Sequence, residues 1–132
     1  MINDLYVGCM KIFISKPQNK SDMEQKKKAM ISQPMAGKTN EEIVADRNRA
    51  VAKLESMGYE VVNTFFTDEW YSKESMTERG VVQIPLCFLA KSLESMSLCH
   101  VVYFVKGWEN TRGCTIERGV ATAYGLSIID EI

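Results

Sequence analysis

Residues 29–43, AMISQPMAGKTNEEI, place a Gly-Lys-Thr sequence (37–39) between an apolar stretch and a charged one. A glycine loop with these residues, leading from a strand into a helix, is typical of a P-loop, whose backbone N–H groups wrap phosphates. That motif needs a second glycine five residues earlier, where Ser32 stands. Its fold also needs an aspartate after another strand to hold magnesium, and HVVYFVKG (100–107) has none. We therefore predict that Thr39 caps a helix, whose N–H groups bind anions only weakly.

The surrounding pattern predicts the elements that would position such a loop. Segments rich in β-branched and aromatic residues predict strands, and apolar residues three and four apart predict helices. The strands are 28–32, 59–66, 100–105 and 126–130, and the helices are 40–57, 85–97 and 114–124. The predicted buried stripes are Ile43, Ala50, Leu54 and Met57, then Leu86, Leu89, Leu93 and Met96, then Ile116, Val120, Ala123 and Tyr124. Residues 67–84 are predicted to form a long polar loop, which is usually functional or mobile.

Strands that alternate with helices predict a three-layer α/β/α fold of the flavodoxin-like type. We expect a parallel sheet of four core strands in the order 2-1-3-4, with right-handed crossovers. Ligands of such folds bind at the carboxyl ends of the strands, beside the point where the strand order reverses. Loops 33–39 and 106–113 follow the two strands at that point. The sequence therefore predicts that both loops face one crevice.

Composition limits the chain to one domain and excludes several partners. Its 132 residues are 45% hydrophobic, which suffices for one core. The net charge is −1, so no basic surface is expected to hold a nucleic-acid polymer. No apolar run approaches the roughly 20 residues that span a bilayer, and no signal-peptide pattern is present, which predicts a cytoplasmic protein without membrane contact. Four cysteines without a Cys-x-x-Cys pair, and a single histidine, predict free thiols, no metal site and no cofactor.

Residues 1–27 are predicted to be an N-terminal extension or linker, and residues 28–132 the α/β domain. Within the extension, KIFIS (11–15) is a candidate for an extra edge strand. ISKPQNKSDMEQ (14–25) also resembles ISQPMAGKTNEEI (31–43) once one residue is skipped. This similarity is either chance or a partial duplication that supplies the extra strand.

Three segments together resemble the nucleoside 2-deoxyribosyltransferase-like superfamily, and most closely a branch of small phage and bacterial proteins. They are ISQPMAG (31–37), HVVYFVKGWENTRGCTIERG (100–119) and AYGLSII (123–129). The resemblance covers about residues 28–130, and its most specific part is the Gly-x-x-x-Glu segment 113–117. It implies a flavodoxin-like fold and an enzyme that cleaves or exchanges the N-glycosidic bond of deoxynucleosides or their 5′-monophosphates. It also implies a site completed by a neighbouring subunit.

The resemblance assigns the nucleophilic glutamate of the family to Glu117. A carboxylate can bond to, or stabilise, a deoxyribosyl carbon that develops oxocarbenium character. We expect Glu117 near the start of a helix, where the dipole keeps it ionised, and at the edge of the apolar stripe. Other family positions differ: Thr111 and Ser92 replace aspartates, Met30 replaces a tyrosine, and His100 replaces the aspartate that opens the third strand. We expect His100 to have a structural role instead.

The two loops supply the expected substrate-binding residues. From the first loop these are Ser32, Gln33, Pro34, Met35 and Gly37, and from the second Trp108, Glu109, Asn110, Arg112 and Gly113. The alternative for the first set is that these residues form the turn without contacting a ligand. Trp108 is expected either to stack on a base or to pack the loop down. Arg112 either binds a phosphate or is a solvated loop residue. A general acid for the leaving base is expected from Glu109 or from a partner subunit. Arg47, inside an apolar stripe, either reaches solvent or pairs across a subunit interface.

Two functions remain open from the sequence. The first is a deoxyribosyltransferase or N-glycosidase that uses Glu117, and the second is a protein that binds a nucleotide or nucleotide-derived signal without turnover. Either function predicts a small-molecule nucleoside or nucleotide as partner. We also expect a homo-oligomer, most simply a dimer, because Phe88 is predicted to lie on the exposed side of its helix.

Overall fold

The computed structural model describes residues 26–62 and 69–132. In chain order, its elements are β1 (Lys28–Ser32), α3 (Asn40–Ser56), β2 (Glu60–Val61), η1 (Glu69–Tyr71), α4 (Lys73–Glu78), α5 (Ile84–Met96), β3 (Val101–Phe104), η2 (Trp108–Asn110), α6 (Arg112–Ala123) and β4 (Ser127–Asp130). The alternation of strands and helices confirms the predicted α/β class.

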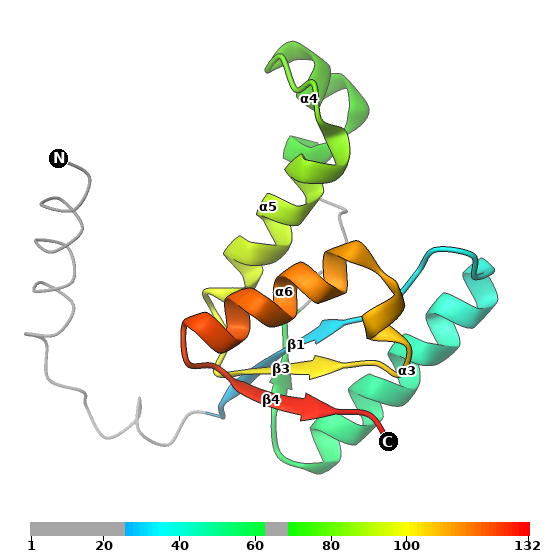
Figure 1. Ribbon diagram of the computed structural model, residues 1–132, viewed down its shortest axis with the longest axis vertical. Coiled ribbons are helices and arrows are strands. Elements are labelled where there is room, and N and C mark those ends of the chain that lie inside the picture. The colour runs from blue at the N-terminus through cyan, green and yellow to red at the C-terminus, as the bar shows by residue number, and fades with distance from the viewer. Residues whose placement is uncertain (1–25, 63–68) are drawn as a thin grey trace, which may run out of the picture.

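The four strands form one parallel sheet in the order β2-β1-β3-β4, as predicted (Figure 1). In the central pair, Ala29 is in register with Val101 and Ser32 with Phe104. The carboxyl ends of β1 and β3 therefore lie side by side, and the loops that follow them leave the same edge of the sheet. This adjacency is the condition on which a shared crevice depends.

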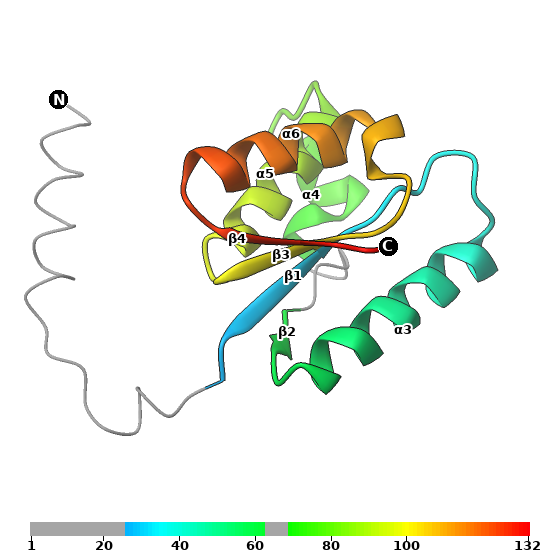
Figure 2. The same cartoon turned by 60° about the horizontal axis from the view of Figure 1, so that its bottom comes forward.

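Helices cover both faces of the sheet and complete the three layers (Figure 2). Alternate strand residues point to opposite faces, so each face has its own core. On one face, Ala29, Ile31, Val101 and Tyr103 pack with Ala50 and Leu54 of α3. On the other face, Met30, Val102 and Phe104 pack with Met96 of α5 and Ala121 of α6. All four residues of β3 are buried, as the continuous apolar run predicts.

Helix α3 begins and ends where its sequence signals predict. The Thr39 hydroxyl accepts a hydrogen bond from the Glu42 N–H, and the Glu42 carboxylate accepts one from the Thr39 N–H, which forms a capping box. At the other end Gly58 has a φ of 90°, a left-handed conformation that glycine adopts without strain. The ammonium group of Lys38 pairs with Asp46 at 2.5 Å. Lys38 is therefore part of the helix entry, which agrees with the rejection of a P-loop.

Several predicted boundaries differ from the structure. The segment predicted as a long polar loop contains η1 and α4, and the Ser72 hydroxyl caps α4 by accepting the Ser75 N–H. A helix of one to two turns has too few residues for an apolar period, so the pattern missed it. Helix α6 begins at Arg112, two residues before the predicted start. Strand β2 is assigned only at Glu60–Val61, and the rest of that predicted strand runs into residues 63–68, outside the described residues.

The predicted edge strand at 11–15 and the similar segment 14–25 also lie outside the described residues. The predicted structural role of His100 is confirmed, because its Nδ1 accepts a hydrogen bond of 3.0 Å from the Lys28 N–H at the amino end of the sheet. In the part of the chain that the structure describes, no helix combines the length and apolar character needed to cross a membrane.

Some residues of the predicted stripes are exposed. Leu86 is 61% exposed and Tyr124 is 76% exposed, and Met57 and Ile116 are also on the surface. For α5 the reason is its placement, because its amino-terminal part projects beyond the sheet (Figure 1). For α6 the buried face is Cys114, Glu117 and Ala121. The predicted stripe of this helix is therefore only partly correct: Val120 packs against the core, whereas Ile116, Ala123 and Tyr124 are exposed.

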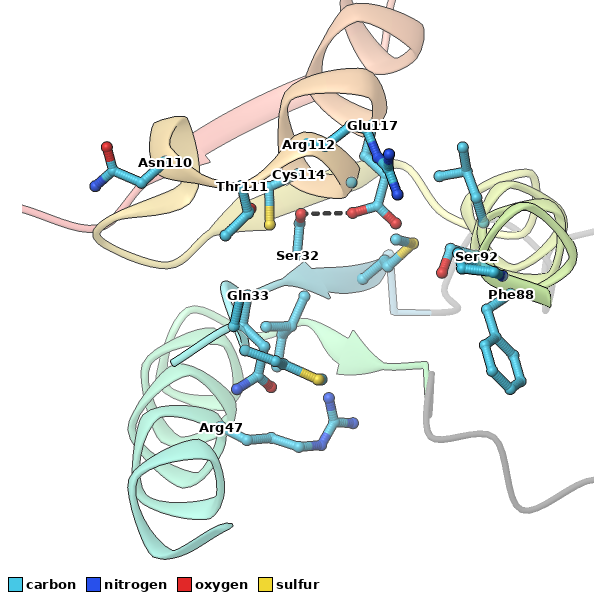
Figure 3. Close-up of a pocket in the computed structure, with 17 residues that line it drawn as sticks. Ser32, Gln33, Arg47, Phe88, Ser92, Asn110, Thr111, Arg112, Cys114 and Glu117 are labelled. Atoms are coloured by element: carbon cyan, nitrogen blue, oxygen red, sulfur yellow. Dashed lines mark hydrogen bonds between the residues drawn. The ribbon is translucent and has the colours of Figure 1, made fainter. Parts of the chain in front are cut away.

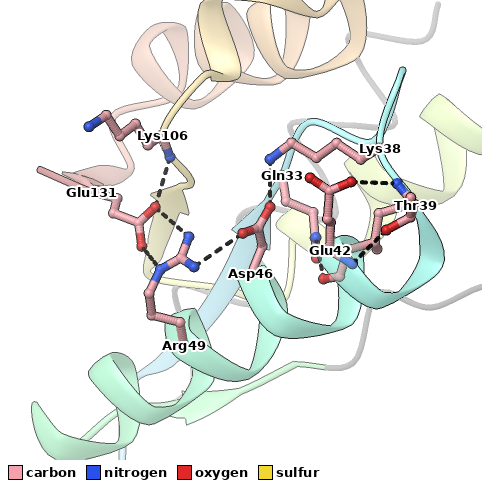
Figure 4. A network of polar contacts seen from close by, with 9 residues as sticks. Gln33, Lys38, Thr39, Glu42, Asp46, Arg49, Lys106 and Glu131 are labelled. Atoms are coloured by element: carbon pink, nitrogen blue, oxygen red, sulfur yellow. Dashed lines mark hydrogen bonds and ion pairs between the residues drawn. The ribbon is translucent and has the colours of Figure 1, made fainter.

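A polar network joins α3 to the segments that follow β3 and β4 (Figure 4). The Arg49 guanidinium donates to both carboxylate oxygens of Glu131, at 2.6 and 2.9 Å, and to Asp46 at 3.1 Å. Glu131 also accepts the Lys106 N–H at 3.0 Å. These bonds, led by the one from Arg49, lower the pKa of Glu131 to about 2. The network therefore fixes the loop after β3 to α3.

We expect the substitution Arg49→Met to lower the free energy of unfolding by about 1 kcal/mol at pH 7, because Arg49 is half-exposed and solvent screens the pair. A carboxylate whose folded pKa is lowered stabilises the fold above its unfolded pKa, near 4.5, and this contribution is lost as the pH falls through about 2. The difference between the two proteins should therefore shrink between pH 4.5 and pH 2. Urea denaturation across this range measures it. Lys53→Met, at an exposed position of the same helix, is the control, and an equal loss in both variants would contradict the prediction.

Candidate functional site

A pocket of about 500 Å³ opens at the carboxyl end of β1 (Figure 3). Residues from β1, α3, α5 and α6 and from both loops line it: Met30, Ile31, Ser32, Gln33, Met35, Ala36, Arg47, Pro85, Phe88, Leu89, Ser92, Asn110, Thr111, Arg112, Gly113, Cys114 and Glu117. The loops also approach each other directly, since a Cβ built on Gly107 would lie 3.6 Å from Cγ of Pro34. The prediction that they face one crevice is confirmed.

Glu117 lies at the centre of the buried face of α6 and points into the pocket (Figure 3). Its side chain is only 7% exposed. Its Oε1 atom accepts a hydrogen bond of 2.6 Å from the Ser32 hydroxyl at the end of β1. A buried carboxylate is unusual unless hydrogen bonds or a function compensate for its removal from water. Here the serine hydroxyl provides one such bond and fixes the direction of the carboxylate.

Burial raises the pKa of Glu117, while hydrogen bonds from the Ser32 and Ser92 hydroxyls act in the opposite direction. The sequence predicted that the helix dipole would keep this group ionised. That expectation is wrong. Glu117 is the sixth residue of α6, beyond the first turn in which the helix dipole acts. Desolvation by burial is the largest influence on its pKa and favours the protonated form. A buried carboxylate with a raised pKa in a pocket is a candidate functional group, because its charged form is poorly solvated.

Cys114 lies one turn before Glu117 on the same buried face and also lines the pocket. Burial raises the pKa of its thiol, which keeps it protonated at neutral pH, and Ser32 and Thr111 are its hydrogen-bonding neighbours. The sequence pattern alone does not predict a site role for this residue. The 3.6-residue period of a helix, applied backwards from Glu117, would have placed Cys114 beside it.

Two guanidinium groups reach the pocket from opposite sides. Arg47 comes from α3 and is only 9% exposed, and burial lowers the pKa of its guanidinium. Arg112 is the first residue of α6 and is exposed. Gln33 anchors the loop between them, because its Nε2 donates to the Ile43 carbonyl of α3 at 3.0 Å. The described residues that line the pocket therefore include one carboxylate and two cations.

The family model for a domain of unknown function, DUF4406, matches residues 27–130. The chain belongs to the DUF4406 family. The matched range includes every residue that lines the pocket and all four strands. No curated protein and no solved structure matches the chain.

Most of the predicted site residues of this DUF4406 protein line the pocket. Ser32, Gln33, Met35, Asn110, Arg112, Gly113 and Glu117 do so, whereas Pro34, Gly37, Trp108 and Glu109 do not. Pro34 is buried in the contact between the two loops. Trp108 packs on Phe104, with ring centroids 5.6 Å apart, and its other contact is the Arg118 guanidinium, 4.3 Å from its centroid. Of the two roles predicted for Trp108, the structure therefore supports packing the loop down.

Helix α5 forms a wall of the pocket that the sequence does not predict. Pro85, Phe88, Leu89 and Ser92 form this wall. Phe88 is half-buried there, so the expectation of an exposed aromatic on the outer side of the helix is wrong. Only the resemblance to the nucleoside 2-deoxyribosyltransferase-like superfamily draws attention to Ser92, at a position where that superfamily has an aspartate. Among residues 26–62 and 69–132, no cluster of three His, Cys, Asp or Glu side chains could hold a metal ion.

Proposed function

We propose that this protein cleaves or transfers the N-glycosidic bond of a deoxynucleoside or deoxynucleotide, with Glu117 as the nucleophile. The observation that carries the proposal is a buried carboxylate that faces a ligand-sized pocket and accepts a 2.6 Å hydrogen bond from Ser32. Pockets of roughly 300–1,000 Å³ bind small organic ligands. The resemblance to the nucleoside 2-deoxyribosyltransferase-like superfamily supports the same reaction at the same residue.

In the proposed reaction, a Glu117 carboxylate oxygen attacks C1′ of the deoxyribose. The C1′–N bond breaks, its electron pair stays on the base, and the base takes up a proton. A glycosyl ester links the sugar to Glu117. Water, or the nitrogen of a second base, then attacks C1′, loses a proton and releases Glu117 as a carboxylate. The Ser32 hydroxyl keeps the attacking oxygen in place throughout.

The leaving base needs a proton, and Glu109, a candidate donor from the sequence, does not line the pocket. Thr111 and Ser92 stand where the resembled deoxyribosyltransferase superfamily has aspartates, and Glu117 is the single carboxylate among the described lining residues. The proton therefore comes from water or from a group outside those residues. Bases that leave readily without an acid are the expected substrates.

A second function is favoured by this same lack of a paired acid. A protein that binds a nucleotide or nucleotide-derived signal needs the pocket and the arginines but no second carboxylic acid. In that case Glu117 accepts hydrogen bonds from the ligand and forms no covalent bond. The two functions differ in one observable, the appearance of free base.

The direct test is incubation with deoxynucleosides and deoxynucleoside 5′-monophosphates carrying each common base, followed by chromatography for free base. Release above the rate without protein supports the enzyme. Binding by calorimetric titration without any release supports the second function. If the protein binds none of these compounds and releases no free base from them, both functions are refuted.

We expect Ser32→Ala to reduce base release about 10- to 100-fold at pH 6, because a hydrogen bond to a charged group contributes about 1.5–3 kcal/mol. Without the donor, the pKa of Glu117 rises further, since the Ser32 bond lowers it in the wild type. The acid limb of the pH–rate profile should therefore move to higher pH. Ser56→Ala, which removes an exposed hydroxyl bound to the Lys53 carbonyl, is the control. An unchanged profile for Ser32→Ala would contradict the proposed role.

The homo-oligomer expected from the sequence remains a proposal, now for a different reason. Phe88 belongs to the pocket wall, but Val82, Ile84 and Leu86 at the start of α5 expose apolar surface. A second copy that covers this surface would lie next to the α5 wall of the pocket. We expect light scattering at micromolar concentration to give at least twice the 15.0 kDa chain mass, and Leu86→Glu to shift it toward the monomer. A wild-type monomer under these conditions would refute the proposal.

A further inference from the structure

The Ser32 hydroxyl that holds Glu117 has a second polar neighbour, the thiol of Cys114. Cys114 lies one turn before Glu117 on α6, is 4% exposed and lines the same pocket. Its sulfur is hydrogen-bonded to the side chains of Ser32 and Thr111. In Figure 3, the Ser32 hydroxyl lies between the Cys114 sulfur and the Glu117 carboxylate. The three side chains therefore form one chain of hydrogen-bonding groups.

The number of available hydrogens sets the direction of this chain when Glu117 is ionised. A hydroxyl group has one hydrogen to donate and can also accept. Ser32 donates its hydrogen to Oε1 of Glu117 at 2.6 Å, and Thr111 donates its own to the Trp108 carbonyl at 3.1 Å. Neither hydroxyl has a hydrogen left for the sulfur. The thiol, which burial keeps protonated, is therefore the donor toward these two oxygens.

A hydroxyl that accepts a hydrogen bond becomes a stronger donor, because hydrogen bonds in a chain polarise one another. Ser32 is 2% exposed and Glu117 is 7% exposed, so water competes little with this effect. Glu117 also accepts a hydrogen bond from Ser92 of α5. The charged groups among the other described lining residues are Arg47 of α3 and Arg112 of α6. Of the two serine hydroxyls that hold the carboxylate, the thiol is hydrogen-bonded to that of Ser32.

We propose that Cys114 is a positioning residue for the Glu117 carboxylate and that it acts through Ser32. Its thiol donates to the Ser32 oxygen and thereby directs the Ser32 hydrogen toward Oε1 of Glu117. The consequence for catalysis rests on the proposed function, but the effect on the carboxylate does not require turnover. Without the thiol, the hydrogen bond from Ser32 should weaken, and Glu117 should be less firmly oriented and less readily ionised.

NMR titration of the Glu117 side-chain carboxyl carbon in the full chain tests this role without a substrate. We expect Cys114→Ala to raise the pKa of Glu117, because the ionised form loses support. Cys114→Ser has nearly the size of the alanine variant but keeps a donor, so it should restore the wild-type pKa. In a Ser32→Ala background, Cys114→Ala should cause no further rise, since its effect passes through the missing hydroxyl.

Base release provides the second readout. Cys114→Ala should lower kcat about 2- to 10-fold, the scale of one neutral hydrogen bond, and change KM less than about twofold. It should have no further effect in the Ser32→Ala background. The control is Cys99→Ala, which removes a half-buried thiol that donates to the Ser95 carbonyl at 3.3 Å, away from the pocket lining. This control should change neither the pKa of Glu117 nor base release.

Three results would overturn the inference. One is a pKa of Glu117 that Cys114→Ala leaves unchanged. Another is an equal change in that pKa with and without the Ser32 hydroxyl, and the third is an equal change in Cys114→Ala and Cys114→Ser; either would mean that Cys114 acts through packing alone. If Cys114→Ala does not fold, Cys114→Val, which keeps more volume and also lacks the donor, takes its place under the same criteria.

The same measurements separate this inference from the proposed function. The expected changes in the pKa of Glu117, without base release by the wild type, would refute the proposed enzyme and leave the positioning role standing. Base release by the wild type, with a pKa of Glu117 that Cys114→Ala leaves unchanged, would do the reverse.

Discussion

Replacing Glu117 with glutamine should reduce base release at least about a thousand-fold, the usual scale for deletion of a nucleophile. Glutamine keeps the size of the side chain and can still accept the Ser32 hydrogen bond. It removes the negative charge that bonds to C1′ or stabilises the oxocarbenium-like transition state. Ground-state binding of a neutral sugar should change little, because catalysis depends on interactions that strengthen in the transition state.

The measurement is single-turnover base release by wild type and Glu117→Gln, with calorimetric titration of the same ligand. Glu55→Gln, at an exposed position of α3, is the matched control and should release base at the wild-type rate. Equal, non-zero release by wild type and Glu117→Gln would show that Glu117 is not the nucleophile. If the protein only binds, neither releases base, and the substitution changes affinity by about one hydrogen bond, ~1 kcal/mol.

The difference in stability between wild type and Glu117→Gln, measured as a function of pH, reports on the Glu117 carboxylate independently of activity. Because burial raises the pKa of Glu117 in the folded state, its contribution to stability is fully present below the unfolded pKa, near 4.5. That contribution is lost as the pH rises through the higher folded pKa. The variant has no such dependence, so it should gain stability relative to wild type as the pH rises from about 4.5 through the folded pKa. A variant that is no less stable at pH 7 also shows that lost activity is not lost folding.

The second large effect is on the fold: Phe104→Ala should lower the free energy of unfolding by about 3–5 kcal/mol. Phe104 in β3 is fully buried and packs with Met30, Met96 and Ala121. Truncation removes this apolar contact and leaves a cavity that the parallel sheet cannot close, since β3 is paired on both sides. It also removes the surface on which Trp108 packs, so the loop that leads to Arg112 should lose its anchor.

Urea denaturation of the wild type, Phe104→Ala and Phe104→Leu measures this effect, and Tyr124→Ala is the control. Phe104→Leu keeps most of the volume and should cost less than about 1.5 kcal/mol. Tyr124 is 76% exposed, so its truncation should change stability by less than about 0.5 kcal/mol. Similar losses in Phe104→Ala and Tyr124→Ala would mean that the core around β3 is not what stabilises the sheet.

The sequence by itself determined the strand order, the start and end of α3, and the two loops that meet. The ends of α3 depend on interactions between residues close in the chain, whereas the strand order follows from the general connection rules for parallel α/β sheets. The capping box joins Thr39 to Glu42, Gly58 adopts the left-handed conformation that ends the helix, and the apolar run at β3 signals a strand covered on both faces. The rules for parallel sheets then place the loops after β1 and β3 side by side.

The tertiary structure alone decided which face of each later helix is buried and which side chains enter the pocket. Periodicity defines a stripe but not the neighbour that covers it, so α6 turns Glu117 inward instead of Ile116 and Tyr124. The partner of Glu117 is Ser32, 85 residues earlier in the chain. Arg47 reaches the same pocket from the opposite face of the sheet, because α3 follows the loop after β1 and packs on that face. No local sequence pattern predicts these long-range contacts, because they form only when the strands pair and the helices pack on the sheet.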